Sequence, residues 1–178
     1  MLLGGTDAHF RGCERKIITE AEMSIDRARA HLSKFGLENK IKEFSVSSAT
    51  VSLAAEALGT EPKRIAKSLS FALGERTILI IAAGDAKVDN RKYRDVFGAK
   101  AKMLAFDDVE RLVGHAVGGV CPFGVNDGVE VYLDRSLERF ETVFPAVGTA
   151  ASAIELTIPE LELASSFIKW VDVTVVAE

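Results

Sequence analysis

Residues Gly114–Gly124 read GHAVGGVCPFG, and the rest of the chain can be organised around this stretch. The pair Gly118-Gly119 has no Cβ atoms, so its backbone can adopt positive φ or lie directly against a ligand. Pro122 removes one N–H donor and restricts the residue before it to extended conformations. The stretch therefore predicts either an ordinary tight turn or a rigid loop beside a binding site. Three apolar side chains could anchor such a loop to a core: Val117, Val120 and Phe123.

Two other stretches share this double interpretation. The small-residue segment VGTAAS, residues 147–152, runs directly into the apolar sequence AIEL. Lys67 lies within IAKSLSF, between two apolar runs. Taken singly, the first fits a hairpin loop and the second a lysine at a strand edge.

Length and composition indicate one folded domain. The chain has 178 residues, of which 48% are hydrophobic and 27% charged, enough apolar material for a substantial core without the composition of a disordered protein. We expect a single domain over residues 20–178 and an N-terminal lead-in over residues 1–19. No apolar run reaches the ~18 residues that a membrane span needs, and the first residues do not resemble a signal peptide, so we expect a cytoplasmic protein.

The cysteines and histidines do not form a metal-binding pattern. They are widely separated, without CxxC or histidine ligand spacing, so we expect neither a metal nor a cofactor. His115 is expected to pack or cap beside the glycine loop, and Cys121 to be a buried structural cysteine. The full set is Cys13, Cys121, His9, His31 and His115.

Charge is distributed unevenly along the chain. Residues 1–60 carry no net charge, residues 61–103 carry +5 and residues 104–178 carry −9. The basic middle segment fits either a solvated helix face or a local contact with the phosphates of an RNA. Its densest part contains Lys87, Arg91, Lys92, Arg94, Lys100 and Lys102.

Hydrophobic periodicity and capping residues predict an α+β domain with a mixed, largely antiparallel sheet surrounded by helices. The apolar runs 65–73 and 77–83 predict a hairpin, the second strand lying inside the sheet. Further strands are expected over 41–46, 102–104, 129–133, 142–144, 152–157 and 168–176, and helices over 20–35, 50–58, 91–97, 109–113 and 158–165. The expected caps are Thr50 or Ser52, Asp89 or Asn90, Asp107, and Asp134 before a short helical turn.

Several enzyme classes are disfavoured. The sequence has no P-loop, no GxGxxG dinucleotide fingerprint, no GxSxG elbow and no HExxH motif.

The ordered set of motifs resembles a known family. Lys67 after the segment AAEALGTEPKRIAKSL, the GHAVGGVCPFG loop, Asp134 and the VGTAASAIEL segment follow one another as in the bacterial aminoacyl-tRNA deacylases. That family includes YbaK, ProX and the editing insertion of bacterial prolyl-tRNA synthetase. The resemblance spans roughly residues 41–163. It implies the barrel-like editing-domain fold and trans-editing hydrolysis of a mischarged aminoacyl-tRNA, without metal or covalent intermediate.

The resemblance also implies a set of site residues. Lys67 corresponds to the functional lysine, expected to act by orientation and charge. Gly118 and Pro122 form the GxxxP pattern, which is expected to shape the pocket and to offer backbone N–H groups. Lys67, Gly118 and Gly119 are the catalytic candidates. The expected substrate-binding residues are Ser47, Ser48, Thr50, Val120, Pro122, Gly148, Thr149 and Ser152. Basic residues that several relatives carry beside the two loops are replaced here by Val125-Asn126-Asp127 and Thr149-Ala150. Contacts to tRNA are therefore expected from Lys87, Arg91, Lys92 and Arg94.

The expected partner is the 3′ end of an aminoacyl-tRNA carrying Ala, Cys, Ser or Thr, together with an aminoacyl-tRNA synthetase; neither a membrane nor DNA is expected. Two alternatives remain open at this stage. One is a non-catalytic module that binds aminoacyl-tRNA or a synthetase, and the other is an esterase for small molecules, whose activity would not depend on salt.

Overall fold

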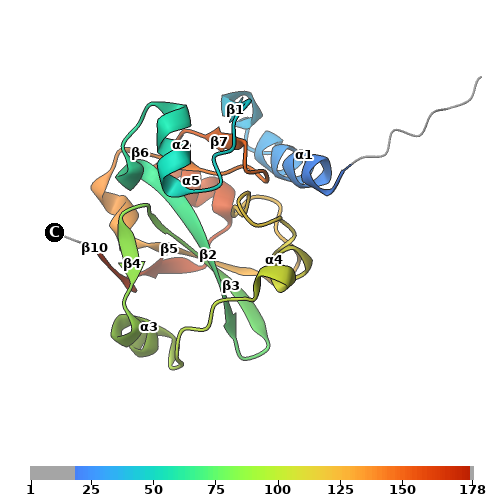
Figure 1. Cartoon of the computed structure of the whole chain (residues 1–178). Helices are drawn as coiled ribbons and strands as arrows, with labels where there is room; N and C mark the ends of the chain where they lie inside the picture. The colour runs from blue at the N-terminus through green and yellow to red at the C-terminus, as the bar shows by residue number, and fades with distance from the viewer. Residues whose placement is uncertain (1–18, 177–178) are drawn as a thin grey trace, which may run out of the picture.

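The computed structural model describes residues 19–176 of the chain (Figure 1). The lead-in expected over residues 1–19, which includes His9 and Cys13, lies outside the described residues except for Thr19. Within this range no helix combines the length and apolar character needed to cross a membrane. The α-helices of the described part are α1 (Glu20–Ser33), α2 (Val51–Leu58), α3 (Asn90–Phe97), α4 (Phe106–Val113) and α5 (Ile158–Ser165).

A six-stranded mixed sheet forms the centre of the fold, with strand order β8-β6-β2-β3-β5-β9. Two short antiparallel pairs, β1–β7 and β10–β4, lie outside it. Of the seven pairings between strands of the described residues four are antiparallel, and the expected α+β fold is confirmed. The strands are β1 (Ile41–Glu43), β2 (Ile65–Leu73), β3 (Arg76–Ala83), β4 (Ala86–Val88), β5 (Glu130–Asp134), β6 (Thr142–Pro145), β7 (Ser152–Ile154), β8 (Leu156–Thr157), β9 (Lys169–Val171) and β10 (Thr174–Val176).

The β2–β3 hairpin forms the two central strands of this sheet, and its two apolar runs predict such a hairpin. Eight residue pairs connect the strands from Ala66–Ala83 to Leu73–Arg76, and Gly74 turns the chain with φ of +62°. β3 lies between β2 and β5, and its residues 78–83 are fully buried. A strand that is apolar on both faces is stable only in such an interior position.

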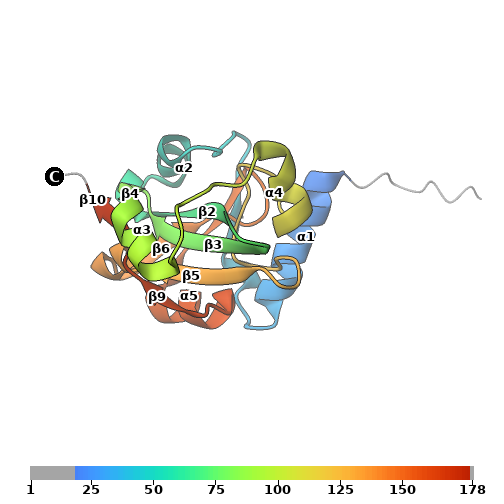
Figure 2. The ribbon, with the colours of Figure 1, turned by 90° about the horizontal axis from the view of Figure 1, so that it is seen from below.

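Helices cover both sides of the sheet. α2 and α4 lie over one side of the β2–β3 hairpin, while α5 and β9 lie toward the other (Figure 2). The larger core cluster joins β3, β5 and α5 to α1 and the glycine loop, and contains Phe123 and Leu133. A smaller cluster on α3 stacks Tyr93 between Phe71 and Phe97, with ring centroids 5.2 and 4.7 Å away.

Most helix ends are where the capping residues predict. Thr50 caps α2 and Asp89 caps α3 through their side chains, and Gly59 and Gly98 end these helices in the left-handed conformation. The expected cap at Asp107 is wrong. α4 begins at Phe106 after Ala105, which has no side-chain acceptor, so Asp107 lies in the first turn and interacts with the helix dipole.

Three expected strands differ in the structure. Residues 102–104 form only a bridge between Met103 and Phe71. The run 152–157 is divided into β7 and β8, and 168–176 into β9 and β10, each half pairing with a different strand. Asp134 explains the second division, because its carboxylate accepts the Val173 N–H at 3.0 Å and the Thr174 hydroxyl at 2.7 Å and so redirects the chain toward β4. Asp134 also accepts the Ser136 N–H, which confirms its expected capping role.

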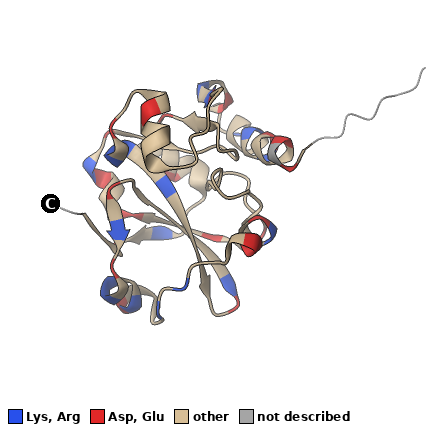
Figure 3. Cartoon of the chain, in the orientation of Figure 1, with Lys and Arg blue, Asp and Glu red and all other residues tan. Residues whose placement is uncertain are grey.

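The basic middle segment lies at one end of the molecule. Lys87 projects from β4, and Arg91, Lys92 and Arg94 belong to α3, at the end opposite α1 (Figures 1 and 3). Lys92 is engaged there by Asp172 at 2.8 Å and by the Thr174 carbonyl at 2.9 Å. Its hydrogen bond to Asp172 raises the pKa of Lys92. Three of the four residues are thus exposed, while Lys92 is tied to the domain.

Candidate active site

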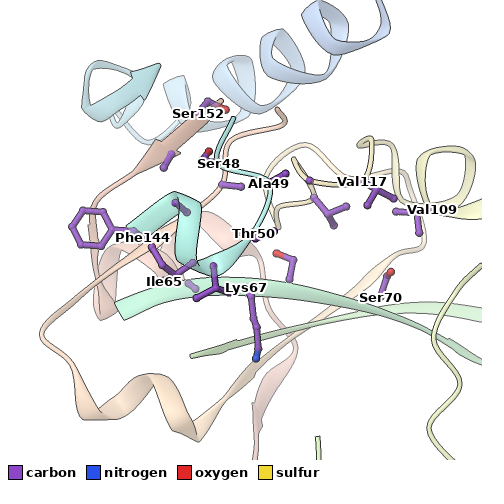
Figure 4. Close-up of a pocket in the computed structure, with 18 of the residues that line it drawn as sticks. Ser48, Ala49, Thr50, Ile65, Lys67, Ser70, Val109, Val117, Phe144 and Ser152 are labelled. Carbon is purple, nitrogen blue, oxygen red and sulfur yellow. The ribbon is translucent and has the colours of Figure 1, made fainter. Parts of the chain in front are cut away.

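A cavity of about 370 Å³ lies where β2, the start of α2, α4 and the two small-residue loops converge (Figure 4). Its wall is mainly apolar, with hydroxyl groups distributed along it. Six of the predicted site residues line this one cavity: Ser48, Thr50, Lys67, Gly118, Val120 and Ser152. They come from segments more than 100 residues apart in the sequence.

His115 holds the Gly114–Gly124 loop against α1. Its Nδ1 lies 2.7 Å from the Ser24 hydroxyl and its Nε2 lies 2.7 Å from the Phe123 carbonyl oxygen. A carbonyl can only accept, so Nε2 carries the proton and Nδ1 accepts from Ser24. Burial lowers the pKa of His115 to about 4, and the ring stays neutral near pH 7. The packing role expected for His115 is confirmed.

Cys121 is a structural residue of the same loop. It is fully buried, and burial raises the pKa of its thiol to about 12. A thiol with so high a pKa is not a nucleophile at neutral pH. This confirms the expectation of a buried, unreactive cysteine.

The two small-residue loops are in direct backbone contact. A Cβ atom on Gly119 would come within 3.0 Å of the Gly148 carbonyl and of the Thr149 nitrogen, so only glycine permits this approach. Gly148, at φ of +81°, in turn lies against the Ser24 carbonyl of α1. Gly119 and Gly148 therefore join the loops behind the cavity and are not among the residues that line it.

The backbone N–H groups of the double-glycine loop differ in whether they already have an acceptor within the protein. The N–H of Gly119 donates to the Ala116 carbonyl at 3.0 Å, which closes a turn and makes this group unavailable to a substrate. Of the two glycines among the catalytic candidates, Gly119 therefore has its N–H already engaged within the loop. The N–H groups of Gly118 and Val120, which do line the cavity, have no acceptor among the described residues.

The hydroxyl groups that line the cavity differ in the hydrogen bonds that they already make within the protein. Ser48 donates to the Ala150 carbonyl at 3.0 Å, and Ser152 donates to the Val147 carbonyl at 2.9 Å, so both brace the second loop. The Thr50 oxygen accepts the Leu53 N–H at 3.2 Å but keeps its own proton free to donate. Ser68 and Ser70, on β2, make no hydrogen bond through their hydroxyls with any described residue.

Lys67 borders the cavity, but its ammonium group is directed elsewhere. The side chain leaves β2 on the side opposite Ser70 (Figure 4). Its Nζ donates to the Gly84 carbonyl at 3.2 Å and to the Ala86 carbonyl, which join β3 to β4. Burial lowers the pKa of Lys67, Asp85 opposes this change and Lys87 adds to it. In this arrangement Lys67 fixes the β3–β4 turn to β2.

Three further predicted residues lie outside the cavity lining. Thr149 donates to Ser152 at 2.8 Å and so supports it from behind, and Ser47 is exposed beside Ser48. Pro122 is buried and borders a separate cavity near Arg27.

Sequence reasoning missed four residues at this site. Ser68 and Ser70 alternate within the apolar strand IAKSLSFAL, a period-2 signal that could have placed both on one face. Met103 and Phe106 line the cavity and are 59% and 73% exposed, so they form an apolar rim at its opening. No local pattern marks that rim, because it depends on where the segment before α4 crosses β2.

Comparison with known proteins identifies the segment that builds this site. Residues 46–163 match the family model of the aminoacyl-tRNA editing domain. The chain is 54% identical over 152 residues to the uncharacterized protein YwhH of Bacillus subtilis, covering 85% of this chain and 97% of that protein.

Two more relatives extend the comparison. A solved structure described as "a putative trans-editing enzyme for prolyl tRNA synthetase" superimposes with a TM-score of 0.77 at 29% identity, covering 85% of this chain and 97% of that one. The proline–tRNA ligase of Bacillus cytotoxicus is 31% identical over 81 residues, which cover 45% of this chain and only 14% of the ligase.

Proposed function

This chain belongs to the family of aminoacyl-tRNA editing domains, and from that premise we propose that it hydrolyses the ester of a mischarged aminoacyl-tRNA. The substrate carries a small amino acid such as Ala, Cys, Ser or Thr, and the protein acts in the cytoplasm as a free-standing trans-editing enzyme. One observation carries the proposal. The cavity opens beside a glycine loop whose Gly118 and Val120 N–H groups have no acceptor among the described residues.

The reaction needs few protein groups, because an aminoacyl ester is already activated. Water attacks the ester carbonyl, the bond to the ribose oxygen breaks, and that oxygen leaves with a proton as the terminal hydroxyl. Positioning and charge stabilisation supply the acceleration. The N–H groups of Gly118 and Val120 are the donors we assign to the developing oxyanion, where one such donor is worth ~3 kcal/mol in other acyl-transfer enzymes. No covalent intermediate is required.

Lys67 is proposed as a positioning residue. Its ammonium bonds to the Gly84 and Ala86 carbonyls and so fixes the β3–β4 turn to β2, the strand that forms one wall of the cavity. Its loss is expected to lower kcat more than it raises KM. Lys67→Met, which keeps the stem but not the charge, separates the role of the ammonium from that of packing.

The tRNA end is proposed to approach across the rim toward α3. Phe106 offers an exposed ring on which the terminal adenine can stack, a contact worth ~1–3 kcal/mol. Lys100 and Lys102 lie exposed on the segment that joins this rim to α3, and Arg91 and Arg94 continue the basic surface. Because Lys92 is bound by Asp172, we expect it to contribute least to RNA binding.

The test is deacylation of a panel of alanyl-, cysteinyl-, seryl- and threonyl-tRNAs by the wild type and by Lys67→Met. Hydrolysis of one or two members, strongly reduced in the variant and weakened by added salt, is the expected result. Binding of tRNA without any turnover by the wild type would contradict the enzyme proposal and favour a non-catalytic binding module. Hydrolysis that does not depend on salt would favour a small-molecule esterase.

A further inference from the structure

The hydroxyl of Ser68 is buried and has no hydrogen-bond partner within residues 19–176. Buried polar side chains in proteins nearly always have one, and leaving such a group unpaired is destabilising. Ser68 also lines the cavity, so a ligand bound there is one source of the missing partner. A hydrogen bond from a bound polar atom would therefore stabilise Ser68 more than the hydroxyls of this cavity that are already paired.

Strand geometry directs Ser68 into the cavity. Ser70, two residues further along β2, points toward the side of Val109 and Val117, whereas Lys67 points the opposite way (Figure 4). Side chains two residues apart on a strand share a face, so Ser68 projects on the same side as Ser70. Both residues line the cavity, and neither hydroxyl has a hydrogen-bond partner in the part of the chain that the structure describes.

The other hydroxyls of the cavity cannot substitute for this pair. Ser48 and Ser152 are bound to carbonyls of the second loop. Thr50 has its oxygen engaged by the Leu53 N–H and retains only a donor. Most of the remaining lining of the cavity is apolar and includes Leu104 and Val109.

We propose that Ser68, with Ser70 beside it, binds the side-chain hydroxyl of a seryl or threonyl group and makes this cavity selective for β-hydroxy amino acids. The inference rests on the proposed function, which supplies the aminoacyl group. A hydroxyl both donates and accepts, so it can satisfy Ser68 in either direction. An alanyl methyl leaves Ser68 unpaired, and a cysteinyl thiol is a weak donor and acceptor. Sites that pair a substrate hydroxyl discriminate against analogues that lack one.

The test uses ligands that cannot be hydrolysed. The probes are 3′-amino-3′-deoxyadenosine carrying an amide-linked seryl, threonyl or alanyl group, and binding is measured by calorimetry. We expect the wild type to bind the seryl and threonyl probes about tenfold more tightly than the alanyl probe. Ser68→Ala should lose this preference while its affinity for the alanyl probe stays the same. Ser33→Ala is the matched control, because Ser33 lies at the exposed end of α1 and its hydroxyl bonds to Ala30.

Two results would overturn the proposal. The wild type could show no preference for the hydroxylated probes, or Ser68→Ala could weaken all three equally, which would mean that Ser68 contacts the α-amino group common to them. The melting temperature of Ser68→Ala should equal or exceed that of the wild type, because the unpaired group has been removed. A marked decrease would instead mean that Ser68 has a structural partner and would also contradict the proposal.

Binding and turnover separate this inference from the proposed function. A wild type that prefers the seryl probe through Ser68 but hydrolyses no aminoacyl-tRNA would refute only the enzyme proposal. A wild type that hydrolyses alanyl-tRNA and seryl-tRNA equally well, without preference among the probes, would refute only the selectivity of Ser68.

Discussion

Protonation of His115 should loosen the loop that forms the back of the active site. His115 is fully buried, and its neutral ring joins Ser24 of α1 to the Phe123 carbonyl. When Nδ1 gains a proton it can no longer accept from Ser24. The buried ring then carries a positive charge, and neither group that bonds to it, the Ser24 hydroxyl or the Phe123 carbonyl, is a carboxylate. Replacing His115 by Gln removes the titration.

The size of the stability change follows from the lowered pKa of His115. Burial lowers the pKa of His115 from 6.5 to about 4 in the folded protein. Between these values the unfolded chain binds the additional proton, so acid favours unfolding and stability rises with pH. Each pKa unit corresponds to about 1.4 kcal/mol, and the free energy of unfolding should fall by about 2 kcal/mol between pH 7 and pH 5 through this group alone.

Urea unfolding at pH 7 and pH 5, in the wild type and in His115→Gln, measures this contribution as the difference between the two pH dependences. Taking the difference removes the contribution of carboxylates common to both proteins. An NMR titration of the His115 ring provides an independent value. Parallel pH dependences, or a ring that titrates near 6.5 in the folded protein, would refute the assigned burial and hydrogen bonding.

Three other substitutions test the site. Gly119→Ala should destabilise the fold by about 3 kcal/mol and lower kcat/KM by at least about tenfold, because its Cβ would separate the two loops. Gly36→Ala is the control, because the space around Gly36 is open. Its free energy of unfolding in urea should fall by about 1 kcal/mol while its kcat/KM stays the same. Phe106→Ala should raise the KM for aminoacyl-tRNA about tenfold, whereas substitution of Leu163, another exposed apolar side chain, by Ala should not. Equal effects of the two substitutions would exclude stacking at the rim. Arg94→Ala should weaken tRNA binding and reduce the slope of log affinity against log salt concentration by about one. An unchanged slope in filter binding would mean that Arg94 on α3 does not contact the RNA.

Much of the fold could be predicted from short-range signals. The limits of α2 and α3 follow from Thr50 and Asp89 at their starts and from glycine at their ends, and the hairpin follows from two apolar runs around Gly74. These features depend on residues within a few positions of one another. The bond from His115 to Phe123 is similarly local, whereas its bond to Ser24 of α1 joins residues 91 positions apart.

The limits of the prediction lie where distant segments compete. The expected strand 168–176 breaks because Asp134 binds the chain at Val173, almost forty positions away. Met103 and Phe106 form a rim only because their segment crosses β2. Pro122 faces away from the cavity that its own loop borders. Periodicity contains no information about such contacts.

By itself, the sequence determined which residues are chemically available at the site: a lysine in an apolar strand, two loops of small residues and a series of hydroxyls. Only the tertiary structure decided how each is used. Gly119 lets the two loops touch, and Lys67 is held by the Gly84 and Ala86 carbonyls. Ser68 lines the cavity, and its buried hydroxyl has no partner among the described residues. The physical reason is that a polar group's role depends on which donors and acceptors surround it, and here those come from segments that only the folded sheet brings together.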